Sequence, residues 1–179
     1  MPSLVRVNRT TSQQSAPAPD TDETADARVG FRPEEVDTAA PTRSARLKWV
    51  VVVDESLPAG RAVNAAICVG AATAAHVAGL LGPSPADASG SLHPGLPWAG
   101  CTVLAADAAA LLAIRAKAEA HDGTFVADMP ASAQATRVYD EYREAVAASG
   151  SDELQYLAVS LVGPRNRIDR IVGRLPLLG

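Results

Sequence analysis

The distribution of apolar residues along the chain predicts strands that alternate with helices. The segment from Leu47 to Val53, LKWVVVV, is a run of β-branched and aromatic residues without alternation, which is typical of a central strand that is covered on both faces. A polar turn with Pro58 and Gly60 then leads into an alanine-rich helix over residues 61–81. Strand, turn and helix in this order form the first half of a βαβ unit.

The rest of the chain predicts three further strands and three further helices. Asp107 is expected to be the N-cap of the first of these helices. The second shows an apolar face at helical spacing, and a Gly-Pro step opens the last one, because proline suits the first helical position. The predicted strands cover residues 101–105, 124–127 and 154–162, and the predicted helices cover residues 107–121, 132–149 (apolar face Ala135, Val138, Tyr142 and Val146) and 164 onward.

Two segments lack such a pattern. Residues 1–28 are rich in small and polar residues and contain no aromatic side chain, which predicts a disordered tail in front of one domain over residues 29–179. Residues 83–100 contain four prolines and predict a long surface loop. Such a loop is either functional or an insertion whose Trp98 packs back onto the core, and the sequence leaves both readings open.

The composition narrows the class of protein. Apolar residues make up 47% of the 179 residues but aromatic ones only 4%, so small side chains must fill the core of an α/β domain through close packing of helices on the sheet. The net charge of -4 makes a nucleic acid an unfavoured partner, because only a local basic patch could bind one. The apolar segment 62–81 includes polar residues and is expected to be a core helix and not a membrane span. No signal sequence is recognisable, so we expect a cytoplasmic protein.

Cysteine and histidine residues suggest no metal chemistry. Cys68 and Cys101 lie in apolar segments without the spacing of a metal motif, and we expect them to be buried, reduced thiols. His76 lies among small apolar residues and is expected to pack in the core or at an interface. We therefore expect no metal and no cofactor.

Two segments in order along the chain resemble a known family. LKWVVVVDESLPAGRAVNAAICVGAA (47–72) and AVSLVGPRNRIDRIVGRLPLL (158–178) are similar to the first and last elements of the peptidyl-tRNA hydrolase II family. The span from about Gly30 resembles still more closely the family called domain of unknown function 2000, through RLKWVVVVDE, LPAGRAVNAA, QATRVYDEY and VGPRNRIDRIVGRLPLL. The resemblance implies a three-layer α/β/α sandwich around a mixed four-stranded sheet, peptidyl-tRNA hydrolase II-like, and a homodimer.

The resemblance also shows which reactive groups have been replaced. The hydrolase family has Gly-Lys-Gly-Lys where this chain has residues 60–63, GRAV, so the second lysine becomes Val63. The family's glutamine and histidine on the following helix correspond to Ile67 and Gly70. These replacements cannot stabilise an oxyanion or orient a water molecule, so the hydrolytic activity is placed in doubt.

Several candidate site residues remain. Asp128 matches the family's aspartate and, with the hydroxyl of Ser132, is our catalytic candidate; its alternative role is that of a helix N-cap. Arg61 and Asn64 could bind an anion, or could simply be solvated and capping residues at a helix start. Thr136 is a further candidate ligand-binding hydroxyl, next along the chain from Ser132.

The last predicted helix carries a row of arginines. Arg167, Arg170 and Arg174 have the spacing i, i+3 and i+7 and form a basic ridge that could bind phosphate. Alternatively, the ridge is a solvated face whose arginines pair with acids such as Asp169.

Three functional hypotheses follow. The first is a non-catalytic or re-purposed relative of peptidyl-tRNA hydrolase II that binds a small anionic ligand or a protein partner near Arg61, Asn64 and Asp128. The second is a hydrolase that uses Asp128 with Ser132 or Thr136 on an ester or a peptidyl-tRNA-like substrate. The third is a structural module in which the helix over 62–81 forms a dimer seam.

Overall fold

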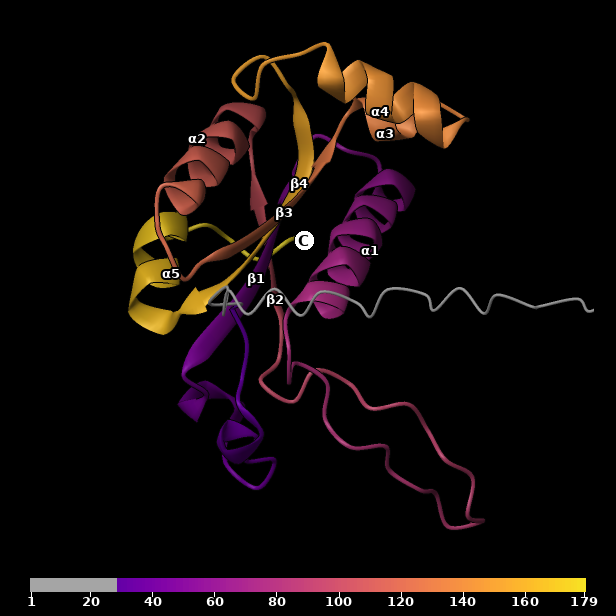
Figure 1. Ribbon diagram of the computed structural model, residues 1–179, viewed down its shortest axis with the longest axis vertical. Helices are drawn as coiled ribbons and strands as arrows, with labels where there is room; N and C mark the ends of the chain where they lie inside the picture. Colours follow the sequence, from indigo (N-terminus) through magenta and orange to yellow (C-terminus); the bar gives the residue numbers. More distant parts are fainter. Residues whose placement is uncertain (1–28) are drawn as a thin grey trace, which may run out of the picture.

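The computed structural model describes residues 29–179 and contains a mixed four-stranded sheet with helices on both faces (Figure 1). The strand order is β2-β1-β4-β3; β1 is parallel to β2 and antiparallel to β4, which is antiparallel to β3. The strands are β1 (Leu47–Asp54), β2 (Thr102–Ala106), β3 (Phe125–Pro130) and β4 (Tyr156–Pro164), and the helices are α1 (Ala59–His76), α2 (Ala108–Glu119), α3 (Ser132–Ala135), α4 (Tyr139–Ala147) and α5 (Arg165–Val172).

The α/β class, the four strands and the mixed sheet are thus confirmed. Two short 3-10 helices, Pro33–Glu35 and Thr42–Ser44, precede β1. The predicted disorder of residues 1–28 lies outside the described residues. Within residues 29–179, none of the helices has both the length and the apolar character that crossing a bilayer requires.

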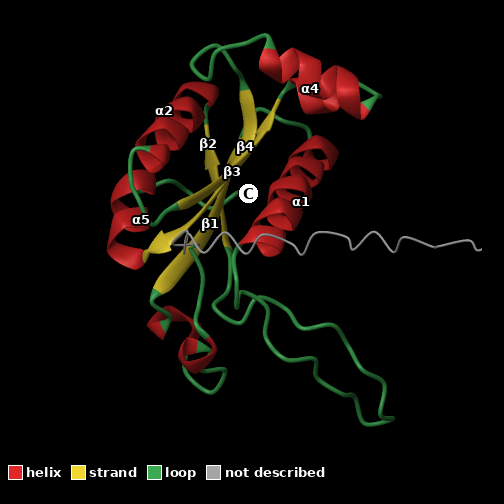
Figure 2. Cartoon of the chain, in the orientation of Figure 1, coloured by secondary structure: helices red, strands yellow, loops and turns green. Residues whose placement is uncertain are grey.

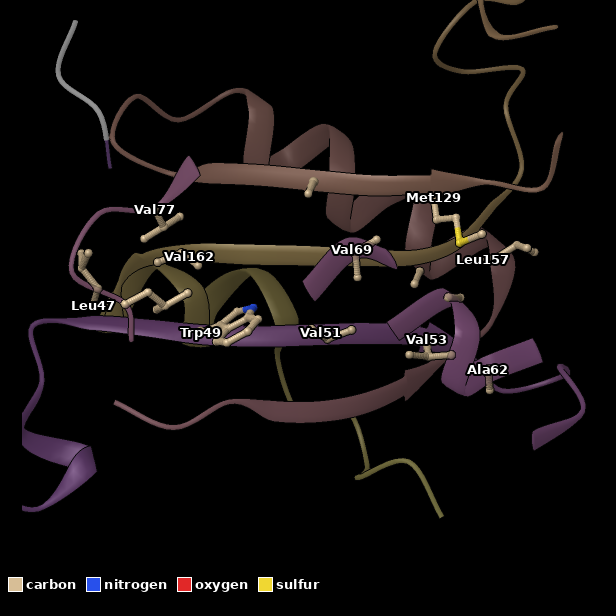
Figure 3. Packing of buried hydrophobic residues seen from close by; sticks show 14 of the residues in the cluster. Leu47, Trp49, Val51, Val53, Ala62, Val69, Val77, Met129, Leu157 and Val162 are labelled. Atoms are coloured by element: carbon tan, nitrogen blue, oxygen red, sulfur yellow. The ribbon is translucent and has the colours of Figure 1, made fainter. Parts of the chain in front are cut away.

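Strand β1 is central and buried on both sides, as its continuous apolar run predicts. Alternate residues Leu47, Trp49, Val51 and Val53 pack in one cluster with α1 (Figure 3). The intervening Val50 belongs to a second cluster, on the face covered by α2 and α5. Because both faces of the strand are covered, its residues from Trp49 to Val53 are all apolar and buried, and the alternation of a half-exposed strand is absent.

Helix α1 packs on the sheet through small residues and ends earlier than predicted. Its buried stripe includes Ala62 and Ala65, which let the helix backbone approach the strands closely. The predicted end at residue 81 is wrong, because the backbone becomes extended at Val77, with a φ of -97° and a ψ of 106°, and the amide of Phe31 then donates to the carbonyl of Ala78 at 2.8 Å. The backbone after α1 therefore pairs with the segment before β1 instead of continuing the helix.

The helix predicted over residues 132–149 is two helices, α3 and α4, joined by an extended linker at 136–138. The hydroxyl of Thr136 donates to the carbonyl of Ser132 at 3.0 Å, and its backbone is extended with a ψ of 156°. No residue of α4 is buried. Of the apolar face that suggested one continuous helix, Val138 and Tyr142 line a surface cleft and not the core.

The predicted loop between α1 and β2 is a long arm that projects from the body (Figure 2). We define the arm as residues 82–98. Its legs meet at the base, where Leu81 forms an antiparallel bridge with Pro97. The ring of Trp98 lies 4.8 Å from that of Phe31, so Trp98 does pack back onto the body, as the second reading of this loop proposed.

Helix α2 begins with the predicted N-cap. The carboxylate of Asp107 accepts a hydrogen bond from the amide of Ala110 at 2.8 Å. We expect Asp107→Ala to lower the free energy of unfolding by about 1 kcal/mol, because that amide loses its acceptor. Chemical denaturation measures this change, and Asp107→Asn, which keeps an accepting oxygen, is the control. Equal stability of Asp107→Ala and the parent protein would contradict the prediction.

Candidate functional site

A cleft of about 580 Å³ opens between α1, the end of β3 and the α3–α4 segment. Helix α1 contributes Cys68, Ala71 and Ala72 to its wall, and β3 contributes Asp128 and Met129. The remaining wall consists of Ala133, Thr136, Arg137, Val138, Tyr139 and Tyr142. The lining is mostly apolar, and its few polar groups are therefore the groups that would orient a bound molecule.

Asp128 does not cap a helix but forms an ion pair with α2. Its Oδ2 accepts from Nε of Arg115 at 2.6 Å, and Arg115 also contacts Glu119 at 2.6 Å. The predicted N-cap role is wrong, because Asp128 lies within β3 and α3 has Ala131 as its N-cap, without a side-chain hydrogen bond. The guanidinium of Arg115 also lies 5.0 Å from the ring centre of Tyr156. Asp128 thus reaches the cleft with its charge already compensated.

Two tyrosines stand over the cleft. The rings of Tyr139 and Tyr142 pack edge to face with their centres 5.5 Å apart. Burial raises the pKa of the Tyr142 phenol, and the nearby charges of Asp128 and then Tyr139 raise it further. Tyr142 therefore stays protonated at neutral pH and can donate a hydrogen bond into the cleft.

The other polar groups of this region differ in how they are engaged. Arg137 is exposed and forms no ion pair with any residue in 29–179. The hydroxyl of Thr136 is committed to the carbonyl of Ser132. The hydroxyl of Ser132 is itself buried and finds no hydrogen-bond partner within the described part of the chain. Arg137 is thus the cation of the cleft that is available to a ligand.

Arg61 and Asn64 are brought together by a residue that sequence reasoning missed. Nε of Arg61 donates to Oε1 of Gln134 at 2.6 Å, and Nε2 of Gln134 donates to Oδ1 of Asn64 at 3.0 Å. Neither Arg61 nor Asn64 lines the cleft. The structure therefore separates Arg61 with Asn64 on α1 from Asp128 with Thr136 at the cleft, and Ser132 does not line the cleft. The residues that Gln134 contacts are 70 or more positions away in the sequence, so no local sequence pattern predicts these contacts.

The arginine ridge on the last helix is less regular than its spacing predicts. Arg167 donates to the carbonyl of Asp122, and Arg170 donates to the carbonyl of Asn166 at 3.1 Å. Arg174 lies beyond the helix, which ends at Val172 and has Gly173, with a φ of 60°, as its C-cap. Asp169, expected to pair with the ridge, instead binds Nζ of Lys48 at 2.6 Å.

Three predictions of burial are wrong. Cys68 and Cys101 are both exposed residues, because Cys68 faces the cleft beside the buried stripe of α1 and Cys101 precedes β2 instead of lying within it. Protein around the Cys101 thiol still desolvates it and raises its pKa to about 12. The core position predicted for His76 is wrong, because His76 is the exposed last residue of α1, where its ring stacks on Phe125 at 5.8 Å; its alternative position at an interface stays a prediction.

Two further expectations concern metals and dimers. Among residues 29–179, no three His, Cys, Asp or Glu side chains gather as a metal site requires. The predicted dimer seam on the helix over 62–81 stays a prediction. Val63 and Ile67 lie on the outer face of that helix and are 55% and 64% exposed.

The mixed sheet with helices on both faces and a cleft at its edge strand defines an α/β protein with a candidate ligand site. Residues 47–179 match the model of the family described as Protein of unknown function (DUF2000), and the chain belongs to this family. The resemblance to the domain of unknown function 2000 is thereby confirmed, whereas the likeness to peptidyl-tRNA hydrolase II stays a prediction.

Among solved structures, the chain is similar to Atu0240, a protein of unknown function from Agrobacterium tumefaciens strain C58. The TM-score is 0.69 at 18% sequence identity, and the match covers 75% of this chain and 98% of the other. At that identity the similarity shows the fold alone. A search of curated proteins finds no match.

Proposed function

We propose that this protein binds a small organic anion with an apolar body in the cleft between α1, β3 and α4, and that it does so without catalysing a reaction. The observation that carries this proposal is the mostly apolar cleft with the unpaired cation Arg137 in its wall, among the residues described. A volume of about 580 Å³ lies within the range of roughly 300–1,000 Å³ that small-molecule sites span.

The apolar walls suit the body of the ligand. Ala71 and Ala72 are too small to fill the space in front of α1, and Met129 and Val138 add apolar surface on the other side. A planar or branched hydrocarbon group would displace water from these walls, and the burial of apolar area would supply most of the affinity. Tyr139 offers an aromatic face or edge for packing.

The polar groups suit an anionic head. The guanidinium of Arg137 has the planar fork that pairs with a carboxylate, and the protonated phenol of Tyr142 is a second donor. The negative charge of Asp128 repels an anion less than a free carboxylate would, because Arg115 compensates it at 2.6 Å. The anion site of this proposal is thus centred on Arg137 and not on Arg61, whose guanidinium is bonded to Gln134.

The hydrolase hypothesis has less support. The layering of helices on both faces of the sheet favours a peptidyl-tRNA hydrolase II-like arrangement, but a fold does not fix a function. A nucleophilic hydroxyl needs a base within hydrogen-bond reach. Ser132 has no partner in residues 29–179, and Asp128 is engaged by Arg115. Release of the N-acylated amino acid and free tRNA from an N-acylated aminoacyl-tRNA would favour hydrolysis instead, if this release disappears in Asp128→Asn.

The test compares carboxylates with matched neutral molecules. Phenylpropionate and phenylbutyrate are expected to raise the melting temperature and to bind in calorimetry, whereas the corresponding amides bind weakly. We expect Arg137→Gln to raise the Kd for the carboxylate about tenfold, which corresponds to about 1.4 kcal/mol. Ala72→Phe, which fills the cleft, should abolish binding of both kinds of molecule.

Arg143→Gln is the matched control. Arg143 is also exposed, but it pairs with Asp140 at 3.1 Å and does not line the cleft. The proposal fails if no carboxylate binds, or if Arg143→Gln weakens binding as much as Arg137→Gln does.

A further inference from the structure

A second, basic pocket lies at the opposite end of the sheet from the cleft. It has a volume of about 270 Å³ and is found where β1 and β2 begin and β4 ends. Three cationic side chains from separate segments line it: Arg43 from the 3-10 helix before β1, Lys48 from β1 and Arg165 from the start of α5. We call this the basic pocket.

The charges in the basic pocket are only partly compensated. Among residues 29–179, none that lines it is acidic. Lys48 is paired with Asp169 at 2.6 Å, and Arg165 directs one guanidinium nitrogen to the carbonyls of Thr42 and Ala45 at 3.5 and 3.4 Å. Arg43 forms no ion pair with any residue of the described range 29–179. Three cations thus share one carboxylate, which leaves an excess of positive charge around a small cavity.

Two neighbouring features also favour the binding of an anion in the basic pocket. Arg165 is the first residue of α5, whose first turn holds no acidic residue and whose N-cap, Pro164, provides no side-chain acceptor. The amide of Arg165 donates to the carbonyl of Arg46 at 3.4 Å, but no carboxylate in the first turn offsets the partial positive charge of this helix end. Burial raises the pKa of the Cys101 thiol, which also lines the pocket, so its sulfur remains neutral and does not compete with an anion.

We propose that the basic pocket binds a phosphate group, either as free phosphate or as the phosphate of a small molecule. A compact oxyanion with up to two negative charges matches three converging cations better than a single carboxylate does. The hydroxyls of Thr42 and Thr102 in the wall are additional donors for its oxygens. This inference is independent of the cleft, because none of these residues lines both.

The experiment uses the full chain and inorganic phosphate as the probe. Millimolar potassium phosphate is expected to raise the melting temperature above that in potassium chloride of equal ionic strength, and calorimetry gives the Kd. Arg43→Gln should raise this Kd about tenfold, while Arg43→Lys should lose less. Arg43 is exposed and its side chain makes no hydrogen bond within residues 29–179, so the protein should fold without it. Glycerol phosphate in a parallel titration separates the two sources: tighter binding than phosphate indicates a phosphomonoester.

Arg170→Gln is the matched control. Arg170 is exposed on α5, the helix that begins with Arg165, but it lies outside the basic pocket. The phosphate affinity should be unchanged in this variant. The proposal is overturned if chloride stabilises the protein as much as phosphate does. It is equally overturned if Arg170→Gln costs as much affinity as Arg43→Gln, since the arginine ridge would then be the anion site.

Discussion

Ser160→Ala is expected to lower the free energy of unfolding by about 1–3 kcal/mol, because it leaves a buried indole N–H without an acceptor. Ser160 is fully buried at the centre of β4. Its Oγ accepts from Nε1 of Trp49 at 2.8 Å and lies 2.7 Å from Oγ1 of Thr73 on α1. These three side chains form a polar chain inside the otherwise apolar cluster between α1 and the sheet.

The protons in this chain can be assigned from the geometry. The hydroxyl of Thr73 donates to the carbonyl of Val69 at 2.7 Å, so it must accept the proton of Ser160, which in turn accepts from Trp49. Removing Ser160 therefore affects Trp49 most, since Thr73 keeps its bond to the helix backbone. Replacing both Trp49 and Ser160 by apolar groups should cost less than the sum of the two single changes.

Urea denaturation of Ser160→Ala, Trp49→Phe and the double variant measures the coupling. Ser84→Ala is the control, because Ser84 is exposed on the arm and a surface change of this kind usually stays within about 0.5 kcal/mol. A loss in Ser160→Ala no larger than that in Ser84→Ala would contradict the assignment, as would strict additivity of the double variant.

Asp128→Ala is expected to destabilise the protein by about 1–3 kcal/mol, less than the 3–5 kcal/mol typical of a fully buried ion pair. The side chains of Arg115 and Asp128 are 16% and 22% exposed, so part of their charge stays hydrated. Without Asp128, Arg115 loses one of its two carboxylate partners and keeps Glu119. Stability is expected to fall because the partly desolvated guanidinium of Arg115 would then be compensated by one carboxylate instead of two.

A surface pair provides the comparison. Asp140 and Arg143 lie 3.1 Å apart and are 75% and 69% exposed, so Asp140→Ala should change the stability by roughly 0–1 kcal/mol. Thermal and urea unfolding measure both variants. If Asp128→Ala costs no more than Asp140→Ala, the Arg115 contact is not a stabilising ion pair. Because Asp128 variants are expected to be less stable, their ligand binding or activity should be measured at temperatures at which the variant is still folded.

The strands could be predicted from the sequence because a buried strand appears as a run of consecutive apolar residues. The run from Leu47 to Val53 reports directly that both faces of β1 are covered, and Asp107 marks the start of α2 by a local hydrogen bond. The division between α3 and α4 could not be predicted in this way. The apolar spacing is shared by both helices, and the break depends on the backbone at Thr136.

The candidate sites could be predicted only in part, because their contacts join distant segments. Asp128 lines the cleft, and its role in a ligand site stays a prediction; its partner Arg115 lies on α2 and shares no sequence motif with it. Gln134 likewise connects Arg61 to Asn64, although it lies 73 and 70 positions away from them in the sequence. Such pairings depend on how α1 and α2 are laid on opposite faces of the sheet, which side-chain periodicity does not specify.

The arm has a consequence for how this chain tolerates changes in length. Leu81 and Pro97 are bridged at its base, so the chain leaves and re-enters the body at neighbouring points, and the crossover from β1 to β2 is already completed by α1. Adding or removing residues at the tip leaves both anchoring points where they are, because longer loops cost little extra closure entropy. The tip is thus a natural attachment point for a fluorophore or a fused domain that must leave the sheet and both proposed sites undisturbed.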